Sequence, residues 1–376
     1  MSTSTKLILV LGATGAQGQA VIDALLAPIS GSNSPSPYSV RALTRDPASP
    51  AAQELTLRGV ECVQGGLNLT ETGSFTNFDA VAKALEGAYG VWVNTDGFTV
   101  GDMVETYAGM RIFELAKCIP TLRHLVWSNL PYLYKESGFN PKYNASHMSG
   151  KGRVADWLQA QPSVVADDAL SWSIVTSSPY MDMLKGGAFT PLNVRADGTV
   201  VFAAPIGLGR VPMIALKDLG WWARWTFDHR AETSARDLGV TSELVDWDHL
   251  AQTFTKVTGK PAVAKRLNLE EYWSLFSEDN IAEPIANARM RGDGSATIKE
   301  NMSAAWRVMR DELFLLNKGS GAIDLEWIHS VHPGTYTLER WIRETGYMGV
   351  GEKPVLKNAR DGKRNWGLNV ERAALL

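Results

Sequence analysis

The most constraining feature of this sequence is a glycine pattern close to its start. The stretch "LILVLGATGAQGQAVIDALLAP" begins with a continuous apolar run, Leu7–Leu11, which is typical of a buried parallel strand. Glycines follow at positions 12, 15 and 18, and the apolar residues after them have helical spacing up to Pro28. A strand, a glycine-rich turn and a helix in this order form the phosphate-binding turn of dinucleotide-binding folds.

Each glycine of this pattern has a mechanical reason. Gly12 permits the tight turn, Gly15 lets the backbone approach a pyrophosphate, and Gly18 lets the helix pack close to the strand. The N–H groups and the dipole at the start of the helix favour an anion. The pattern therefore predicts a nucleotide site, and the alternative is a packing turn in a sheet domain that has lost its ligand.

The end of the second predicted strand, "YSVRALTR", indicates which nucleotide is bound. Proteins that bind NAD usually carry an acid here for the ribose 2′-hydroxyl, but this strand ends at Arg45. A planar guanidinium suits a phosphate, which predicts NADP(H). Arg41 is expected on the same face and could assist, whereas Asp46 before Pro47 fits a turn. The alternative for Arg45 is an exposed charge at a strand end.

Strands and helices alternate through the first half of the chain. The predicted strands cover residues 7–11, 38–45, 59–65, 89–95, 122–128 and 170–177, and helices are predicted at 16–28, 78–88, 104–119 and 146–160. This alternation predicts an α/β fold, a doubly wound parallel Rossmann sheet with helices on both faces.

The regularity weakens after Pro179. Short strands and turns are expected over residues 189–216, and amphipathic helices at 217–229, 247–260, 268–279, 303–317 and 337–346. We therefore expect a smaller, mostly helical C-terminal cap. The predicted division is a Rossmann domain over residues 1–180, to which 213–260 partly returns, and a substrate or cap domain from 181–212 and 261–376.

Composition narrows the class of protein. The chain has 376 residues and a net charge of −3, and the absence of a basic run argues against nucleic acid as a partner. The apolar run near the N-terminus is too short for a signal peptide or a membrane span. Cys62 and Cys118 lie in apolar stretches and are expected to be buried and reduced. We expect a cytoplasmic protein without a membrane partner, and no metal, because the histidines show no ligand spacing.

Several segments together resemble the NmrA-like family, an atypical branch of the short-chain dehydrogenase/reductase superfamily. They include "GATGAQGQAV", "VRALTRDP", "HLVWSNL", "HMSGKGRV" and "IVTSSPYM", and the resemblance covers roughly residues 5 to 260. The family contains enzymes and also NADP-binding regulators, so it leaves the function class open. The cofactor contacts that the resemblance implies are Gly12, Thr14, Gly15, Ala16, Gln17, Gly18, Arg45, Leu67, Asn94, Thr95, Lys151, Pro179 and Tyr180.

Two departures from related patterns concern the site. Gly65-Gly66-Leu67 stands where the family often has Gly-Asp-Leu, which implies a more open adenine side. The superfamily's Tyr-x-x-x-Lys is here His147 and Lys151, which share a helix face at this spacing. A histidine ordinarily titrates near ~6.5 and needs less help than a tyrosine to act as an acid or base.

These positions give a set of predicted catalytic residues. His147 would move a proton. The resemblance to the superfamily implies that Lys151 holds the ribose, and that Ser128, which ends the fifth strand where the superfamily places its carbonyl-binding serine, binds a substrate carbonyl. Local hydrogen bonding is the alternative for His147, and backbone capping is the alternative for Ser128. The residues that could take over these roles are Asn129, Tyr132, Tyr134 and Tyr143.

The second half of the chain is rich in tryptophan, which indicates an aromatic core and an apolar pocket below the cap. We predict an NADP(H)-dependent oxidoreductase for a bulky apolar metabolite, alkaloid- or polyketide-like, with hydride transfer to or from C=O, C=N or C=C. A variant in specialised metabolism couples the redox step to a cyclisation. The alternative is a non-catalytic NADP(H) sensor that binds a protein partner; an epimerase is disfavoured by the missing tyrosine. The superfamily also implies a homodimer.

Overall fold

A seven-stranded parallel sheet forms the centre of the molecule, with the strand order β10-β6-β5-β4-β1-β2-β3. The computed structural model describes residues 5–29, 31, 34–65, 74–286, 296–316, 319, 321–356 and 366–376. The strands of the sheet are β1 (Lys6–Leu11), β2 (Tyr38–Thr44), β3 (Glu61–Gln64), β4 (Gly90–Val93), β5 (His124–Asn129), β6 (Ser171–Ser177) and β10 (Asp237–Val240).

The order of the strands confirms the doubly wound fold. From β1 the chain builds outward through β2 and β3, and then returns to build the other half through β4, β5, β6 and β10. The direction therefore reverses between β1 and β4, and ligands of such sheets bind beyond the carboxyl ends of the strands at this point. The six predicted strands are present. The seventh, β10, was not predicted, because its short stretch becomes a strand through pairing with β6.

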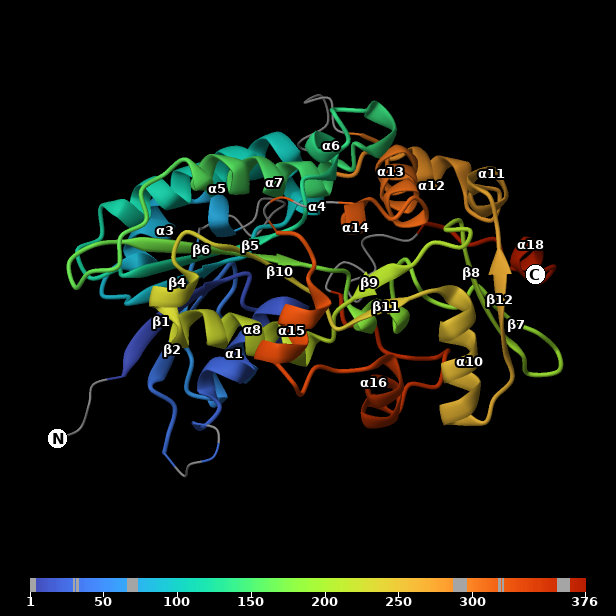
Figure 1. Cartoon of the computed structure of the whole chain (residues 1–376), viewed down its shortest axis with the longest axis horizontal. Coiled ribbons are helices and arrows are strands. Elements are labelled where there is room, and N and C mark those ends of the chain that lie inside the picture. Colours follow the sequence, from blue (N-terminus) through green and yellow to red (C-terminus); the bar gives the residue numbers. More distant parts are fainter. Residues whose placement is uncertain are drawn as a thin grey trace.

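Helices cover both faces of the sheet (Figure 1). One face is packed by α1 (Ala16–Leu26), α2 (Pro50–Leu57), α8 (Leu216–Asp228) and α15 (Leu325–Val331). The other is packed by α3 (Phe78–Leu85), α5 (Asp102–Lys117) and α7 (Ser146–Gln159). Short helices, α4 (Gly97–Val100), α6 (Leu133–Glu136) and α9 (Arg230–Thr233), complete this part. Each long helix packs its apolar stripe on a face of the sheet. The helices therefore cover the faces of the sheet and do not cover the carboxyl ends of its strands, which the cap faces.

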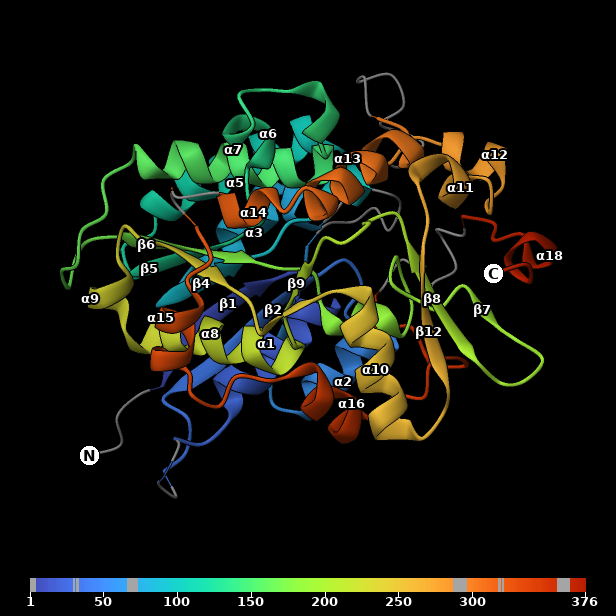
Figure 2. The same cartoon turned by 45° about the vertical axis from the view of Figure 1, so that its right-hand side comes forward.

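The cap lies beyond the carboxyl ends of the strands, at the right of Figures 1 and 2. Its strands are β7 (Asn193–Val194), β8 (Val200–Ala204) and β12 (Ala262–Arg266), with a separate pair, β9 (Val211–Met213) and β11 (Glu243–Val245). Its helices are α10 (Trp247–Thr258), α11 (Leu269–Trp273), α12 (Glu278–Ala282), α13 (Ile298–Arg310), α14 (Leu313–Leu316), α16 (Leu338–Thr345) and α18 (Val370–Ala373). Helices dominate, as predicted, but β12 was not expected; it pairs in parallel with β8.

The cap has an aromatic core of its own, and most of the cap tryptophans are in it. Trp247, Trp273, Trp306 and Trp341 are all buried there. One compositional expectation was wrong: Cys118 is exposed where α5 ends, whereas Cys62 is half-buried. None of the described helices is both long and apolar enough to cross a membrane.

Candidate cofactor and substrate site

A cavity of about 710 Å³ lies between the carboxyl edge of the sheet and the cap. Most residues predicted for the site line it, and they come from the β1–α1 turn, from the ends of the central strands and from α7. These residues are Gly12, Thr14, Gly15, Ala16, Gln17, Arg45, Asn94, Thr95, Ser128, His147, Lys151, Pro179 and Tyr180. Gly18 is buried in α1 behind the turn, and Leu67 lies outside the described residues.

The β1–α1 turn has the shape that its glycines predicted. Gly12 has a φ of +77°, and a Cβ atom there would lie 2.9 Å from the carbonyl oxygen of Asn94. A Cβ on Gly18 would lie 2.3 Å from the carbonyl oxygen of Gly12, so α1 packs directly on the turn. Gly15 is the N-cap of α1 and supplies no side-chain cap. The first N–H groups of α1 thus have no capping side chain, and such groups suit a pyrophosphate.

The two arginines of β2 have different surroundings. Arg45 lines the cavity just beyond the end of the strand. Arg41 instead donates from Nε to Glu61 Oε2 at 2.9 Å and from Nη1 to the carbonyl oxygens of Ala84 and Glu86. The expectation that Arg41 assists at the nucleotide was therefore wrong, because its guanidinium already joins β2 to β3 and α3. Arg45 is the arginine of this strand that can meet a ribose phosphate.

Lys151 is anchored at the floor of the cavity by a buried ion pair. Its Nζ donates to the carbonyl and hydroxyl oxygens of Thr95, both at 3.0 Å, and to the carbonyl oxygen of Ser128 at 3.3 Å. Glu105 Oε1 lies 3.4 Å from the same nitrogen. Burial raises the pKa of the fully buried Glu105, against the opposing charge of Lys151. Sequence reasoning missed Glu105, because a single acid within a helix looks like an ordinary surface charge.

Ser128 belongs to a buried network centred on Gln17. Its hydroxyl donates to Gln17 Oε1 at 2.7 Å, and the indole of Trp92 donates to the same oxygen at 3.3 Å. Gln17 Nε2 then donates to the Tyr180 hydroxyl at 3.1 Å. Burial raises the pKa of Tyr180 to about 12, which keeps its phenol protonated at neutral pH. In this arrangement Ser128 directs its hydrogen to Gln17, and Tyr180 is the hydroxyl that sequence reasoning did not consider as a donor.

His147 is half-buried at the start of α7, where it meets a residue of the cap. The Oδ1 atom of Asn301 accepts from the Ser146 hydroxyl at 2.9 Å and from the backbone N–H of His147 at 3.3 Å. A backbone N–H can only donate, so this contact identifies the atom as the oxygen and fixes the orientation of the amide. The ring also lies against Phe98, with centroids 4.6 Å apart.

The orientation of this amide places two partners near one ring nitrogen of His147. Asn301 Nδ2 lies 2.9 Å from His147 Nδ1, and Asn301 Oδ1 lies 3.1 Å from it. A neutral ring can accept from Nδ2, and a protonated ring can donate to Oδ1, so Asn301 holds Nδ1 in either charge state. In the neutral form that accepts from Nδ2, the ring proton is on Nε2.

The alternative proton carriers do not line the cavity. The Tyr143 hydroxyl donates to Asp311 Oδ2 at 2.7 Å. Tyr132 packs against Gly152, and neither it nor Tyr134 lines the cavity. Asn129 does line it, but its amide donates to the Thr176 hydroxyl at 2.9 Å.

The cap side of the cavity is apolar. Its lining comes largely from one face of α13 and from the aromatic side chains around that helix. The larger side chains here are Phe189, Tyr272, Phe276, Met302, Trp306, Met309, Phe314 and Trp366. The cavity therefore has a polar floor at the sheet and an apolar wall under the cap.

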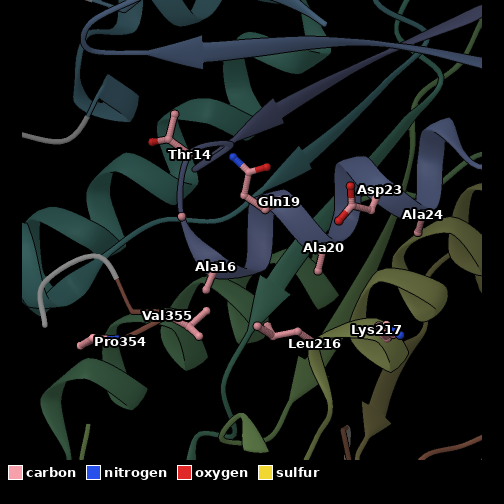
Figure 3. Close-up of a pocket in the computed structure, with 11 residues that line it drawn as sticks. Thr14, Ala16, Gln19, Ala20, Asp23, Ala24, Leu216, Lys217, Pro354 and Val355 are labelled. Atoms are coloured by element: carbon pink, nitrogen blue, oxygen red, sulfur yellow. The ribbon is translucent and has the colours of Figure 1, made fainter. Parts of the chain in front are cut away.

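A second hollow lies on the outer side of the same turn (Figure 3). Ala16, Ala20 and Ala24 follow one side of α1 there and face Leu216 and Val355. Its polar side chains are those of Thr14, Gln19, Asp23 and Lys217, and it shares Thr14, Gly15 and Ala16 of the turn with the cavity described above. Among the described residues there is no group of three or more His, Cys, Asp or Glu side chains that could hold a metal ion.

Comparison with known proteins identifies the family of the chain. The sequence model of the NmrA-like family matches residues 4–318. The chain belongs to the NmrA-like family. A related NmrA-like family domain-containing oxidoreductase of Penicillium ochrochloron is 26% identical over 292 residues, which cover 69% of this chain and 75% of the relative.

Solved structures show the same fold with low sequence identity. NmrA, a negative transcriptional regulator in complex with NADP, has a TM-score of 0.67 at 18% identity, over 91% of this chain and 95% of that one. The triphenylmethane reductase of Citrobacter sp., in complex with NADP(H), has a TM-score of 0.58 at 16% identity, over 90% of this chain and 99% of that one. The NmrA-like fold thus occurs in a named regulator and in a named reductase. The fold alone therefore does not distinguish these functions, and the residues of the site must be considered.

Proposed function

We propose that this NmrA-like protein is an NADP(H)-dependent oxidoreductase that acts on a bulky apolar substrate. The observation that carries the proposal is the composition of the cavity between the sheet and the cap. The glycine turn, Arg45 and Lys151 line it on the sheet side, an apolar wall lines it on the cap side, and His147 lies where α7 meets the cap. A cofactor and a substrate of low polarity would therefore meet beside a group that can move a proton.

The cofactor is assigned to the sheet side on the fit of the residues present. The turn at Gly12 and Gly15 and the start of α1 suit the pyrophosphate, and Arg45 suits the 2′-phosphate. Lys151 is buried with its counter-ion Glu105 and would hold the ribose of the nicotinamide half. When bound, NADPH supplies hydride for a C=O, C=N or conjugated C=C group.

His147 is assigned the proton transfer. The acid is the protonated ring, whose Nδ1–H donates to Asn301 Oδ1. Its Nε2–H gives the proton that a reduced oxygen or nitrogen of the substrate requires, and the ring is left neutral with its remaining proton on Nδ1. We assign Ser128 to the orientation of Gln17 and, through Gln17, of Tyr180. This differs from the role predicted from the sequence, in which Ser128 binds the substrate carbonyl directly.

The substrate is assigned to the cap side, where aromatic and methionine side chains predominate. A polycyclic metabolite would bury its apolar surface there, at about 25 cal/mol per Å². The named activity of the Citrobacter triphenylmethane reductase shows that another protein of this fold acts on a large aromatic compound. A cyclisation after the redox step, within fungal-type specialised metabolism, is the more specific form of this proposal.

The second candidate function is that of a redox-sensing regulator. It is favoured by the fold shared with the regulator NmrA, which was solved with NADP, and by the absence of the superfamily's tyrosine. It is disfavoured by the cavity, because an apolar space flanked by His147 and Ser128 has no purpose in a protein that only binds a nucleotide and a partner surface.

A binding titration followed by a turnover screen tests the proposal. We expect NADPH to bind more tightly than NADH, and NADPH oxidation with at least one bulky enone, quinone, imine or triphenylmethane dye. His147→Gln should bind NADPH like the wild type and lose most of the turnover. Tight NADPH binding with no turnover on any of these classes would favour the regulator, and an absence of NADPH binding would refute both functions.

A further inference from the structure

Tyr180 is the most accessible member of the hydrogen-bond network that is centred on Gln17. Tyr180, Gln17 and Ser128 all line the cavity. Gln17 is 3% exposed and Ser128 is 2% exposed, whereas Tyr180 is half-buried. A ligand in the cavity therefore meets the Tyr180 side chain more readily than it meets the other two.

The hydrogen bonds of this network have a fixed direction. The indole N–H of Trp92 can only donate, and it donates to the side-chain oxygen of Gln17. This contact fixes the orientation of the amide, so its Nε2 atom faces Tyr180 and donates to the phenol oxygen at 3.1 Å. Ser128 gives its hydrogen to the same Gln17 oxygen at 2.7 Å. The hydrogen of Ser128 is therefore used within the network, and the hydrogen of Tyr180 points away from Gln17.

The hydrogen of the Tyr180 hydroxyl has no acceptor among the described residues. The carboxylate of Asp96 lies close enough to contribute to the raised pKa of Tyr180. Its oxygens, however, accept from the backbone N–H of Phe98 and from the Thr99 hydroxyl. The phenol can therefore donate to a group that enters the cavity.

The backbone on both sides of Tyr180 is held in place. The N–H of Ile214 donates to the carbonyl oxygen of Pro179, and the N–H of Met181 donates to the carbonyl oxygen of Ile214, both at 2.9 Å. The ring is thus positioned by its own backbone and by Gln17. A donor that is fixed before a ligand arrives loses little entropy when it forms a hydrogen bond.

We propose that the Tyr180 hydroxyl donates a hydrogen bond to the reacting carbonyl oxygen of the substrate, in the role first predicted for Ser128. This inference rests on the proposed function, because it places the substrate beside NADPH in the cavity. It deepens that function by stating the reacting group: a ketone, quinone or enone, and not an iminium. A carbonyl oxygen has two lone pairs, one for Tyr180 and one for His147, whereas an iminium nitrogen has none.

The two side chains have different parts in the reduction of this carbonyl group. The carbon gains hydride from NADPH, the π electrons of the C=O bond move to the oxygen, and the oxygen takes the proton of His147. Tyr180 keeps its own proton, because burial raises its pKa to about 12. Its O–H stabilises the negative charge that develops on the oxygen before the proton arrives.

Reduction of phenanthrenequinone, a flat tricyclic compound with two carbonyl groups, tests this role. Tyr180→Phe keeps the ring and removes the O–H, and should lower kcat about 100-fold, the usual effect of losing one donor to a developing oxyanion. N-methylacridinium, a tricyclic cation that takes hydride on carbon and has no oxygen, should be reduced as fast by the variant as by the wild type. Both rates are measured above the reaction without protein, and fluorescence titration should show unchanged affinity for NADPH.

Two further variants separate Tyr180 from its surroundings. Tyr38→Phe is the matched control, because it removes a phenol that donates to Asp228 from the start of β2, away from the cavity. It should keep the kcat of the wild type. Because Ser128 acts through Gln17 and Tyr180, the double variant Ser128→Ala/Tyr180→Phe should be no slower than Tyr180→Phe alone.

The possible outcomes distinguish this inference from the proposed function. An unchanged kcat in Tyr180→Phe would overturn the inference, and so would a loss of NADPH affinity that accounts for the slower rate. A further large loss in the double variant would place the carbonyl oxygen at Ser128. A wild type that reduces imines or dyes, but no ketone, quinone or enone, would also overturn the inference without any variant and leave the proposed function standing. If the wild type reduces none of these classes, the proposed function itself is wrong.

Discussion

Asn301 Nδ2, on cap helix α13, lies 2.9 Å from Nδ1 of His147, at the start of helix α7. Asn301 is fully buried, and its Oδ1 also accepts from Ser146 and from the backbone N–H of His147. This contact joins the cap to the Rossmann domain at the residue that we assign to proton transfer. The orientation and the tautomer of His147 therefore depend on a residue of the cap.

Replacing Asn301 should change the titration of His147. In Asn301→Asp a carboxylate faces Nδ1 and favours the charged ring, so the pKa of His147 should rise by about 1–3 units. The C2–H resonance of His147 reports this titration without a substrate, and His147→Gln assigns the signal. In the pH profile of kcat/KM, the limb that requires the protonated ring should move to higher pH by the same amount.

Two further variants test the role of Asn301, one by removing its amide and one as a control at a neighbouring position of α7. Asn301→Ala should lower kcat about 10-fold or more, because the ring loses its fixed orientation. Ser149→Ala should leave both the titration and kcat close to wild type, because the Ser149 hydroxyl donates to Asn144 instead. An unchanged titration of His147 in Asn301→Asp would show that the amide does not control the ring.

Arg45 and Arg41 offer a matched pair for the nucleotide. Arg45→Ala should weaken NADPH binding by about 10- to 100-fold, the cost of one charge-assisted contact with a phosphate, and should leave NADH binding almost unchanged. Arg41→Ala should change neither affinity, because its guanidinium is held by Glu61 and by two backbone carbonyl oxygens. Fluorescence titration with both nucleotides measures these constants. Equal losses of NADPH and NADH binding in Arg45→Ala would place the 2′-phosphate elsewhere.

The sequence predicted those parts of the site that depend on neighbours in the chain. The turn at Gly12 and the strand before it follow from local spacing, and Lys151 follows from a motif on one helix. The partners of these residues come from distant segments: Asn301 is 154 positions away from His147, and Glu105 reaches Lys151 from a different helix. The tertiary contact of a single acid or amide in a helix cannot be predicted from the residues around it in the sequence. Strand β10 was missed for the same reason, since its pairing with β6 makes it a strand.

The buried pair of Lys151 and Glu105 should be strongly coupled. Glu105→Gln keeps the shape of the side chain but leaves the ammonium group without a counter-ion, and should lower the free energy of unfolding by roughly 3 kcal/mol. Lys151→Met, which leaves the carboxylate unpaired, should have a cost of similar size. The double variant should lose less than the sum of the two single losses, by at least about 1 kcal/mol. Urea unfolding of the four proteins measures the cycle, and additive losses would contradict the coupling.

His124 should make the protein less stable as the pH falls below neutrality. Burial, together with the charge of Arg230, lowers the pKa of His124 to about 3, and the neutral ring lies between the hydroxyls of Ser171 and Ser173. The unfolded chain binds a proton near pH ~6.5, whereas the folded protein does not until about pH 3. The contribution of His124 to the free energy of unfolding is therefore complete above the pKa of the histidine in the unfolded chain. It is lost as the pH falls, by roughly 2 kcal/mol at pH 5.

The pH dependence of the stability of a His124 variant tests whether His124 destabilises the folded protein as the pH falls. The free energy of unfolding is measured by urea unfolding at pH 7 and at pH 5. Between these two pH values, His124→Gln should lose roughly 2 kcal/mol less of this free energy than the wild type does. At pH 7 the variant should be less stable than the wild type. The exposed His329 serves as the control, and His329→Gln should lose as much stability as the wild type. If His124→Gln and the wild type lose equal stability over this range, the folded protein must take up the proton on His124 as readily as the unfolded chain does.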